Sequence, residues 1–229
     1  MTNAATSASL AVVIPARNES TTIGKVIAAV RQHLPQANVL VVDDGSIDDT
    51  EKIAQEAGAT VVRHQEPRGK GAALRTGFQA VVAELIVTID GDGQDDAADL
   101  PALVDCATDG VDLVIGSRFL GRFEPGSISW PNYLATRGFN LLIRLRRGTR
   151  VTDSQAGVRC YRRAAVDSIE WTSTEYEVET ELLLRIIEAG GSIREVPVRR
   201  QPRQGGQTSF QRIRHGVRIL RTILLGRTP

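Results

Sequence analysis

The sequence has few cysteines and no long apolar segment. Cys106 and Cys160 are the only two cysteines in the chain, and neither has a metal-ligand spacing. We therefore expect them to be small core residues of a reduced, intracellular protein. No apolar run approaches the length of a membrane-spanning helix, about 20 residues, and Met1 to Ser9 carries no secretion-signal pattern. A soluble or peripheral protein of the cytoplasm is expected.

The phosphate-binding loops of two large nucleotide-binding classes are also lacking. The first predicted strand, at residues 10–15, is followed by Ala16-Arg17-Asn18-Glu19 and not by Gly-x-Gly-x-x-Gly. The segment Gly69-Lys70-Gly71-Ala72 lacks the spacing of a Gly-Lys-Ser/Thr loop. These absences exclude a Rossmann dehydrogenase and a phosphate-loop NTPase.

Charge is present in both signs, but it is unevenly distributed. Residues 1–112 carry 8 basic and 17 acidic residues, a net charge of −9, whereas residues 113–229 carry 20 basic and 10 acidic residues, a net charge of +10. The acids thus concentrate where a cation would bind, and the arginines where anions or an anionic surface would bind. Two solvated faces of opposite sign are the alternative.

Strand and helix patterns alternate along the first half of the chain. Such alternation is typical of an α/β protein with a mostly parallel sheet flanked by helices. Short apolar runs predict strands at residues 10–15, 39–42, 60–63, 84–89 and 112–116, and apolar spacings of three and four predict helices at 22–33, 71–83 and 100–108. Beyond residue 118 we expect a basic helix at about 134–147, strands at 157–161 and 193–198, a helix at 177–189 between them, and a final helix at 209–225.

Polar and acidic residues follow three of the predicted strands, at the sheet edge where α/β proteins bind ligands. They are Asn18 and Glu19, then Asp43 and Asp44, then Asp90, Asp92 and Gln94. Carboxylates suit ribose hydroxyls and base N–H groups, and a dense oxygen cluster suits Mg²⁺ or Mn²⁺ on a diphosphate. An acidic turn that caps the following helix is the alternative for the last group.

The order of these segments resembles family 2 glycosyltransferases with the GT-A fold, a Rossmann-like sheet. The resemblance is closest to dolichyl-phosphate mannose synthases and polyprenyl-phosphate hexosyltransferases, and it runs from about residue 10 to residue 200. It rests on Val13-Ile14-Pro15-Ala16-Arg17-Asn18-Glu19, Val42-Asp43-Asp44-Gly45-Ser46-Ile47-Asp48-Asp49-Thr50, Gly69-Lys70-Gly71-Ala72-Ala73-Leu74-Arg75-Thr76-Gly77, Asp90-Gly91-Asp92-Gly93-Gln94, Gly116-Ser117-Arg118 and Asp153-Ser154-Gln155-Ala156-Gly157-Val158-Arg159.

The resemblance implies one domain over residues 1–229, with a nucleotide-sugar half at about 10–117, an acceptor half at about 118–208 and a C-terminal helix at about 209–225. It also implies roles for residues of the donor site. Those expected to bind the nucleotide sugar are Pro15, Ala16, Asn18, Glu19, Asp43, Lys70, Asp90, Gly91 and Arg203, with Arg203 and Ser209 on a loop that closes over the phosphates. The expected ligands of Mg²⁺ or Mn²⁺ are Asp90, Asp92 and Gln94.

The resemblance further implies an acceptor site built on arginine. Arg118 would grip the acceptor phosphate, since a guanidinium fork matches that geometry, and Thr136 with Arg137 would lie beside it. Asp92, Arg118 and Asp153 are the candidate catalytic residues.

Three departures from the pattern concern the acceptor. Gln94-Asp95-Asp96 stands where the lipid-phosphate enzymes usually have Gln-His-Pro, the segment 206–210 lacks the lysine of their closing loop, and Asn132 stands where an arginine is expected. A phosphate acceptor is already ionised at neutral pH, since its second pKa is about 6, and needs no general base. A hydroxyl acceptor would need one, for which Asp153, Glu179 and Glu181 are candidates.

The last predicted helix is basic and amphipathic. Its apolar residues are Phe210, Ile213, Val217, Leu220 and Leu224, with arginines between them. Such a helix suits an anionic membrane, where a polyprenyl phosphate would be found, and it equally suits docking on the core or on another subunit.

The sequence therefore predicts an inverting, metal-dependent glycosyltransferase at the cytoplasmic membrane face. It would move a hexose from a GDP-mannose or UDP-glucose type donor to a dolichyl or undecaprenyl phosphate. A hydroxyl acceptor, a nucleotidyltransferase and a non-catalytic scaffold are the alternatives. We expect no nucleic-acid partner, and an oligomer stays open.

Overall fold

The computed structural model of the protein describes residues 9–203 and 212–226. Ser209 and Phe210, which the sequence places on the closing loop and the last helix, lie outside the described residues.

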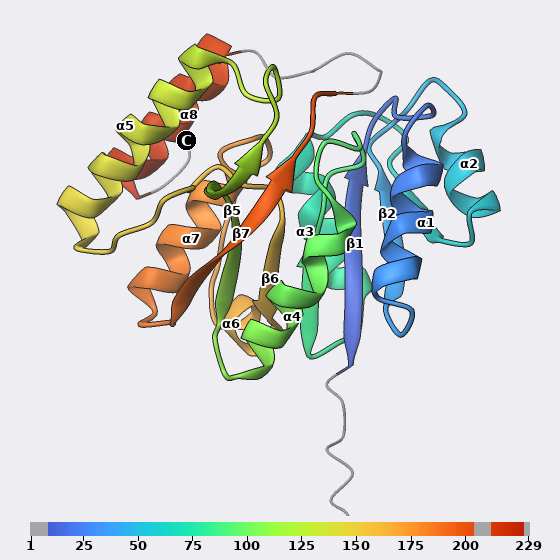
Figure 1. Ribbon diagram of the computed structural model, residues 1–229, viewed down its shortest axis with the longest axis horizontal. Helices are drawn as coiled ribbons and strands as arrows, with labels where there is room; N and C mark the ends of the chain where they lie inside the picture. Colours follow the sequence, from blue (N-terminus) through green and yellow to red (C-terminus); the bar gives the residue numbers. More distant parts are fainter. Residues whose placement is uncertain (1–8, 204–211, 227–229) are drawn as a thin grey trace, which may run out of the picture.

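One seven-stranded sheet organises the chain, in the order β3-β2-β1-β4-β6-β5-β7 (Figure 1). Its strands are β1 (Leu10–Ala16), β2 (Asn38–Asp43), β3 (Thr60–Arg63), β4 (Leu85–Thr88), β5 (Leu113–Phe123), β6 (Arg159–Arg162) and β7 (Ile193–Arg200). Strand β6 runs antiparallel to β4 and β5, and the remaining pairs are parallel. The expected mostly parallel α/β sheet is confirmed.

Helices cover both faces of this sheet (Figure 1). They are α1 (Ile23–His33), α2 (Thr50–Glu56), α3 (Lys70–Ala80), α4 (Leu100–Thr108), α5 (Trp130–Arg147), α6 (Arg163–Asp167), α7 (Val178–Glu188) and α8 (Arg212–Leu225), with a 3₁₀ turn at Ala97–Asp99. Helix α5 begins four residues before its expected start, because Pro131 occupies its first turn, where proline is well accommodated. Strand β5 continues past residue 116, since it pairs with β7 as far as Phe123 after a register shift beyond Ser117.

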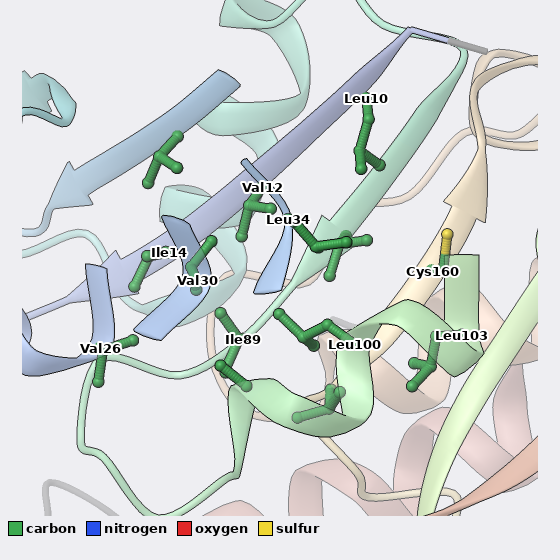
Figure 2. Packing of buried hydrophobic residues seen from close by; sticks show 14 of the residues in the cluster. Leu10, Val12, Ile14, Val26, Val30, Leu34, Ile89, Leu100, Leu103 and Cys160 are labelled. Carbon is green, nitrogen blue, oxygen red and sulfur yellow. The ribbon is translucent and has the colours of Figure 1, made fainter. Parts of the chain in front are cut away.

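Two apolar cores lie on opposite faces of the sheet, because alternate residues of a strand point to opposite sides. Val12 and Ile14 of β1 belong to the core under α1 and α4 (Figure 2). Val13 belongs to the core under α3 and α7. Each such buried side chain contributes about 1.5–3 kcal/mol. The central strands are thereby fixed on both sides, and so are the loops at their carboxyl ends.

Helices α5 and α8 lie side by side at one end of the sheet (Figure 1). Helix α8 buries His215, Ile219, Thr222 and Ile223. The apolar stripe identified in the sequence faces outward instead, since Ile213 is 84% exposed and Val217, Leu220 and Leu224 are also exposed. The alternative in which this stripe docks on the chain's own core is therefore wrong for its described residues.

Candidate functional site

A cavity of about 900 Å³ opens at the carboxyl ends of the central strands. The loops after β1, β2 and β4 form one part of its wall, and α5 and α8 form the other. In the sheet, β2 and β3 lie on one side of β1, and β4 lies on the other side of it. The cavity thus lies at the point where the strand order reverses, which is the usual ligand site of open α/β sheets.

The fold brings most of the expected donor and metal residues to this cavity. The backbone of Asp44 donates to the Ala16 carbonyl (2.9 Å), which joins the ends of β1 and β2. Of the predicted residues, those in the cavity wall are Pro15, Ala16, Glu19, Lys70, Asp90, Gly91, Asp92, Gln94, Arg118, Thr136 and Arg203.

Asp43, predicted to line the nucleoside pocket, is not in the cavity wall. Its side chain is fully buried behind the wall and accepts hydrogen bonds from the backbone and hydroxyl of Ser46. Residue 43 is the last of β2, so its side chain is directed into the turn, and the next residue, Asp44, lines the cavity instead. Asn18 is likewise outside the wall, because its side-chain oxygen accepts from the backbone of Ile47 (2.9 Å).

Asp44 is tied into a buried network. One of its carboxylate oxygens accepts from the backbone of Arg68 (2.8 Å) and lies 2.7 Å from His64 Nδ1. The other accepts from the backbone of Gly69 (2.8 Å), where φ is +93°, a conformation that favours glycine. Asp44 therefore fixes the turn that starts α3 and carries Lys70 into the cavity.

Lys70 neutralises the acidic wall of the cavity. Its Nζ lies 2.7 Å from Asp90 Oδ1 and 2.7 Å from Glu179 Oε1. Burial disfavours the charge of Lys70, but these two carboxylates outweigh burial and raise its pKa. Burial acts against ionised Asp90 as well, yet Lys70 holds the pKa of that carboxyl below its ordinary value. Both groups are charged at neutral pH.

The absence of a side chain at Gly157 leaves room for the carboxylate of Asp90. A Cβ at this position would lie 2.7 Å from Asp90 Oδ2 and 3.1 Å from Asp90 Cγ. The Gly157 carbonyl accepts from the Thr88 hydroxyl (2.8 Å), which fixes this close approach of the backbone. Only glycine fits here without displacing the carboxylate.

Asp92, Glu19 and Arg203 form the second charged group. Arg203 Nη1 lies 3.2 Å from Asp92 Oδ2, and Nη2 donates to Glu19. Burial, together with the nearby Asp90, raises the pKa of Asp92. Burial also raises the pKa of Glu19 to about 7, against the opposing effect of Arg203. These carboxylates are poorly solvated and would be stabilised by added positive charge.

The donor set fits a hard divalent cation in part. Asp90, Asp92 and Gln94 supply oxygen atoms at one place in the wall. Among the described residues, no group of three or more His, Cys, Asp or Glu side chains could hold a metal ion by itself. This arrangement matches a cation that is bound by one or two carboxylates and completed by substrate phosphates.

Arg118 and Asp153 form the arginine end of the site. Asp153 is fully buried and accepts from Arg118 Nε (2.6 Å), Arg118 Nη2 (2.7 Å) and the Arg118 backbone (3.1 Å). The Asp153 backbone donates to Glu195 (3.0 Å). Asp153 does not line the cavity, whereas Arg118 does. The aspartate therefore positions the guanidinium and is not placed to act as a general base.

The two predicted acceptor residues on α5 face different ways. Thr136 is buried and lines the cavity, but Arg137 is exposed and contacts the Tyr133 hydroxyl (3.3 Å). A step of one residue turns a helix by about 100°, so the side chains of residues 136 and 137 point in different directions. The structure does not place Arg137 in the cavity.

Several residues of the wall were missed by the sequence analysis. They are Tyr176, Arg200 and His215. Tyr176 and His215 are far apart in the chain, yet their rings lie 4.8 Å apart, and no local pattern announces that contact. Asp44 is named in the sequence analysis as the second of the two acids at the end of β2, but without a separate role in the donor site.

The family model for glycosyl transferase family 2 matches residues 11–170. The chain belongs to this family. It is a glycosyltransferase, and its sheet and helices match the GT-A fold of solved neighbours.

Three relatives show the range of similarity. The dolichyl-phosphate hexose transferase of Haloferax volcanii is 34% identical over 217 residues, covering 94% of this chain and 92% of the relative. The polyprenol monophosphomannose synthase of Mycolicibacterium smegmatis is 31% identical over 199 residues, covering 82% and 75%. Glucosyl-3-phosphoglycerate synthase of Mycobacterium tuberculosis, crystallised with Mn²⁺, UDP-glucose and phosphoglyceric acid, has a TM-score of 0.78 at 25% identity, covering 97% and 81%.

Within residues 9–203 and 212–226, no helix has the length and apolar character needed to cross a bilayer.

Proposed function

We propose that this glycosyltransferase moves a hexose from a nucleoside diphosphate sugar to a polyprenyl phosphate, with inversion at the anomeric carbon and with the help of Mg²⁺ or Mn²⁺. The observation that carries the proposal is the lining of one cavity. Its wall combines the acidic strand ends, Arg118 and residues of α5 and α8. A donor diphosphate with its cation, an acceptor phosphate and a lipid chain would each find matching groups in that wall.

The donor end is assigned from its charges. A nucleoside would lie against Pro15, Ala16 and Asp44, and the diphosphate would lie towards Asp92, Gln94 and Arg203. A divalent cation held by Asp90, Asp92 and Gln94 would stabilise the negative charge of the departing diphosphate. Arg203 would turn from Asp92 to a phosphate oxygen, since a guanidinium pairs well with phosphate.

The acceptor end favours an anion. The Arg118 fork is oriented by Asp153 and would hold the acceptor phosphate next to the hexose. An oxygen of that phosphate attacks the anomeric carbon while the bond from this carbon to the diphosphate breaks, and the nucleoside diphosphate leaves with the electron pair. The phosphate is already ionised, so no protein base has to remove a proton.

The apolar part of the cavity wall suits an isoprenoid chain. It includes Pro131, Ala135 and Phe139 of α5 and Ile219 of α8. Relatives named as dolichyl-phosphate hexose transferase and polyprenol monophosphomannose synthase support a lipid phosphate as the acceptor.

The outer faces of the same two helices suit a membrane surface. They carry exposed apolar side chains in a row on each helix, with exposed arginines such as Arg144 and Arg221 beside them. Such a surface binds anionic bilayers through apolar burial and charge. The chain would thus act as a peripheral protein at the cytoplasmic membrane face. The apolar residues are Trp130, Leu134, Leu141 and Leu145 on α5, and Ile213, Val217, Leu220 and Leu224 on α8.

A hydroxyl acceptor is the second candidate, favoured by one observation. The solved neighbour with phosphoglyceric acid is a glucosyl-3-phosphoglycerate synthase, and His215 lies in the present cavity as a titratable group. Among the carboxylates proposed as bases, Glu179 is paired with Lys70, and Glu181 accepts from Ser173 outside the cavity.

The decisive experiment offers both acceptors. The protein is incubated with Mg²⁺ or Mn²⁺, UDP-glucose or GDP-mannose, and either a short polyprenyl phosphate or 3-phosphoglycerate, and products are identified by mass spectrometry. We expect a hexosyl lipid phosphate, with the inverted anomer by NMR, and no product from Asp92→Ala. Transfer to phosphoglycerate alone would overturn the lipid acceptor.

Membrane association is tested separately by flotation with anionic liposomes. Leu141→Ser with Leu145→Ser should release the protein from liposomes. Val82→Ser is the matched control, because Val82 is 93% exposed but lies outside α5 and α8. Equal flotation of both variants and the wild type would contradict the assignment of this surface.

A further inference from the structure

The end of β7 is joined to the loop that follows Asp92. The Gln201 backbone donates to the Gln94 carbonyl (2.8 Å), and the Gln94 side-chain nitrogen donates to the Gln201 carbonyl (3.2 Å). Arg200 adds two side-chain contacts, from Nη1 to Asp95 Oδ1 (2.7 Å) and from Nη2 to Gln94 Oε1 (2.8 Å). One arginine thus connects a buried carboxylate to the amide of a candidate metal ligand.

These contacts fix the orientation of the Gln94 amide. Its nitrogen donates to a carbonyl, and its oxygen accepts from a guanidinium, so a flipped amide would set donor against donor and acceptor against acceptor. An amide oxygen has two lone pairs and can accept one hydrogen bond while it binds a cation. The Gln94 backbone also donates to Asp92 Oδ1 (3.1 Å), which keeps the two candidate ligands together.

Asp95 in turn holds Arg200. The Asp95 side chain is 2% exposed and that of Arg200 is 12% exposed, so the pair is largely removed from water. A buried charge that loses its partner is strongly destabilised, so each member of the pair keeps the other in place. The order of support therefore runs from Asp95 to Arg200 to the Gln94 oxygen.

We propose that Arg200, anchored by Asp95, is a positioning residue that orients the Gln94 amide oxygen towards the divalent cation of the donor site. This inference rests on the proposed function, since it concerns the cation that the donor diphosphate would bring. Groups that orient a metal ligand in this way affect metal affinity by about 10–100-fold when they are changed.

The neighbouring Arg199 provides a matched control. It lies on the same strand and pairs with two acids of the same region, with Nη2 3.2 Å from both Asp96 and Asp99. Its side chain is 54% exposed, and it neither lines the cavity nor contacts Gln94. Removing the charge of Arg199 therefore changes the electrostatic potential near Asp96 and Asp99 without removing a contact of the Gln94 amide.

The test measures Mn²⁺ binding directly, by electron paramagnetic resonance of free Mn²⁺ in the presence of saturating UDP or GDP. The full chain is compared with R200K, R200Q, D95N and R199Q. We expect R200K and R200Q to weaken Mn²⁺ binding by about tenfold or more, D95N to weaken it less, and R199Q to stay within about twofold of the wild type. R200K keeps a positive charge next to Asp95, but an ammonium group lacks the planar fork that contacts Asp95 and Gln94 together. This variant therefore tests the support of the Gln94 amide even if R200Q does not fold.

Wild-type Mn²⁺ affinity in R200K and R200Q would overturn the inference, and so would an equal loss in R199Q, which would point to overall charge. These results would leave the proposed function standing if the wild type binds Mn²⁺ with the nucleotide. Absence of Mn²⁺ binding by the wild type would overturn the inference together with the metal dependence of the proposed function.

Discussion

Replacement of Asp153 by asparagine tests whether this residue positions Arg118 or removes a proton. The carboxylate is fully buried, and Arg118 contacts it through Nε at 2.6 Å and Nη2 at 2.7 Å. Asparagine keeps the size of the side chain but removes the charge and presents an N–H₂ group to a guanidinium that can only donate.

The size of the effect follows from burial. Loss of one partner of a buried ion pair costs about 3–5 kcal/mol. The Arg118 side chain is 13% exposed and the asparagine oxygen can still accept one hydrogen bond, so we expect the lower end of that range, about 3 kcal/mol. A change of 1 kcal/mol moves the melting temperature of a domain of this size by about 2–4 °C, which predicts a fall of about 6–12 °C.

The assay is thermal unfolding followed by circular dichroism, with Asp167→Asn as the control. Asp167 also pairs with an arginine, Arg163 at 3.5 Å, but its side chain is 61% exposed, so its loss should cost at most about 1 kcal/mol. Equal melting temperatures for the two variants would refute the structural reasoning.

Kinetics then separate the two roles of Asp153. A positioning role predicts a raised KM for the phosphate acceptor, because the Arg118 fork is no longer oriented, and an unchanged shape of the pH profile. A general-base role predicts a loss of kcat together with the acidic limb of the pH–rate profile. The second outcome would show that the acceptor is a hydroxyl.

Three further changes test the acidic wall. Glu19→Gln should remove a pH dependence. Burial raises the pKa of the folded Glu19 from about 4.5 to about 7, so the stability of the wild type relative to the variant should fall as the pH rises between these values. Because solvent screens this partly exposed carboxyl, the fall should be at most about 3 kcal/mol, as urea unfolding at pH 4.5, 6 and 8 would measure. Gly157→Ala should lower the free energy of unfolding by about 1–3 kcal/mol and displace Asp90, so calorimetry should detect no binding of UDP with Mn²⁺. Gly138→Ala in α5 is the control. A Cβ at residue 138 meets nothing within 4 Å, so this change should be neutral or stabilising. Lys70→Met should leave the carboxylates of Asp90 and Glu179 without their cation, so its melting temperature should fall by about 6 °C or more, as circular dichroism would measure.

The sequence predicts best those strands and helices whose own residues carry a clear apolar pattern. The runs that became β1, β2 and β4 are short and almost entirely buried, and such runs announce central strands. Strand β6 is different, because its four residues carry arginines at both ends and its place between β4 and β5 depends on partners distant in the chain. Its antiparallel direction could not be obtained from its own residues.

The same distinction holds for the site. Glu19, Asp90 and Asp92 follow strands directly, so the edge of the sheet brings them together whatever the side-chain details. The sequence pattern could not tell which of Asp43 and Asp44 lines the cavity, because it locates a strand end only to within one residue, and a shift of one residue reverses the direction of a side chain. Arg200 and His215 enter the cavity from β7 and α8, through contacts that the order of the chain does not reveal.

The closely spaced carboxylates of Asp90 and Asp92 are held by cations from two distant segments. Lys70 at the start of α3 pairs with Asp90, and Arg203 beyond β7 reaches Asp92. The two cations differ in how easily they can leave. Lys70 lies between two carboxylates and is 13% exposed, whereas Arg203 is 22% exposed. We therefore expect a diphosphate with its cation to displace Arg203 from Asp92 and to leave Lys70 in place. The cation that comes with the donor would then take over the pairing of Asp92 from Arg203. Lys70 would meanwhile keep Asp90 ionised, so that this carboxylate can bind the cation.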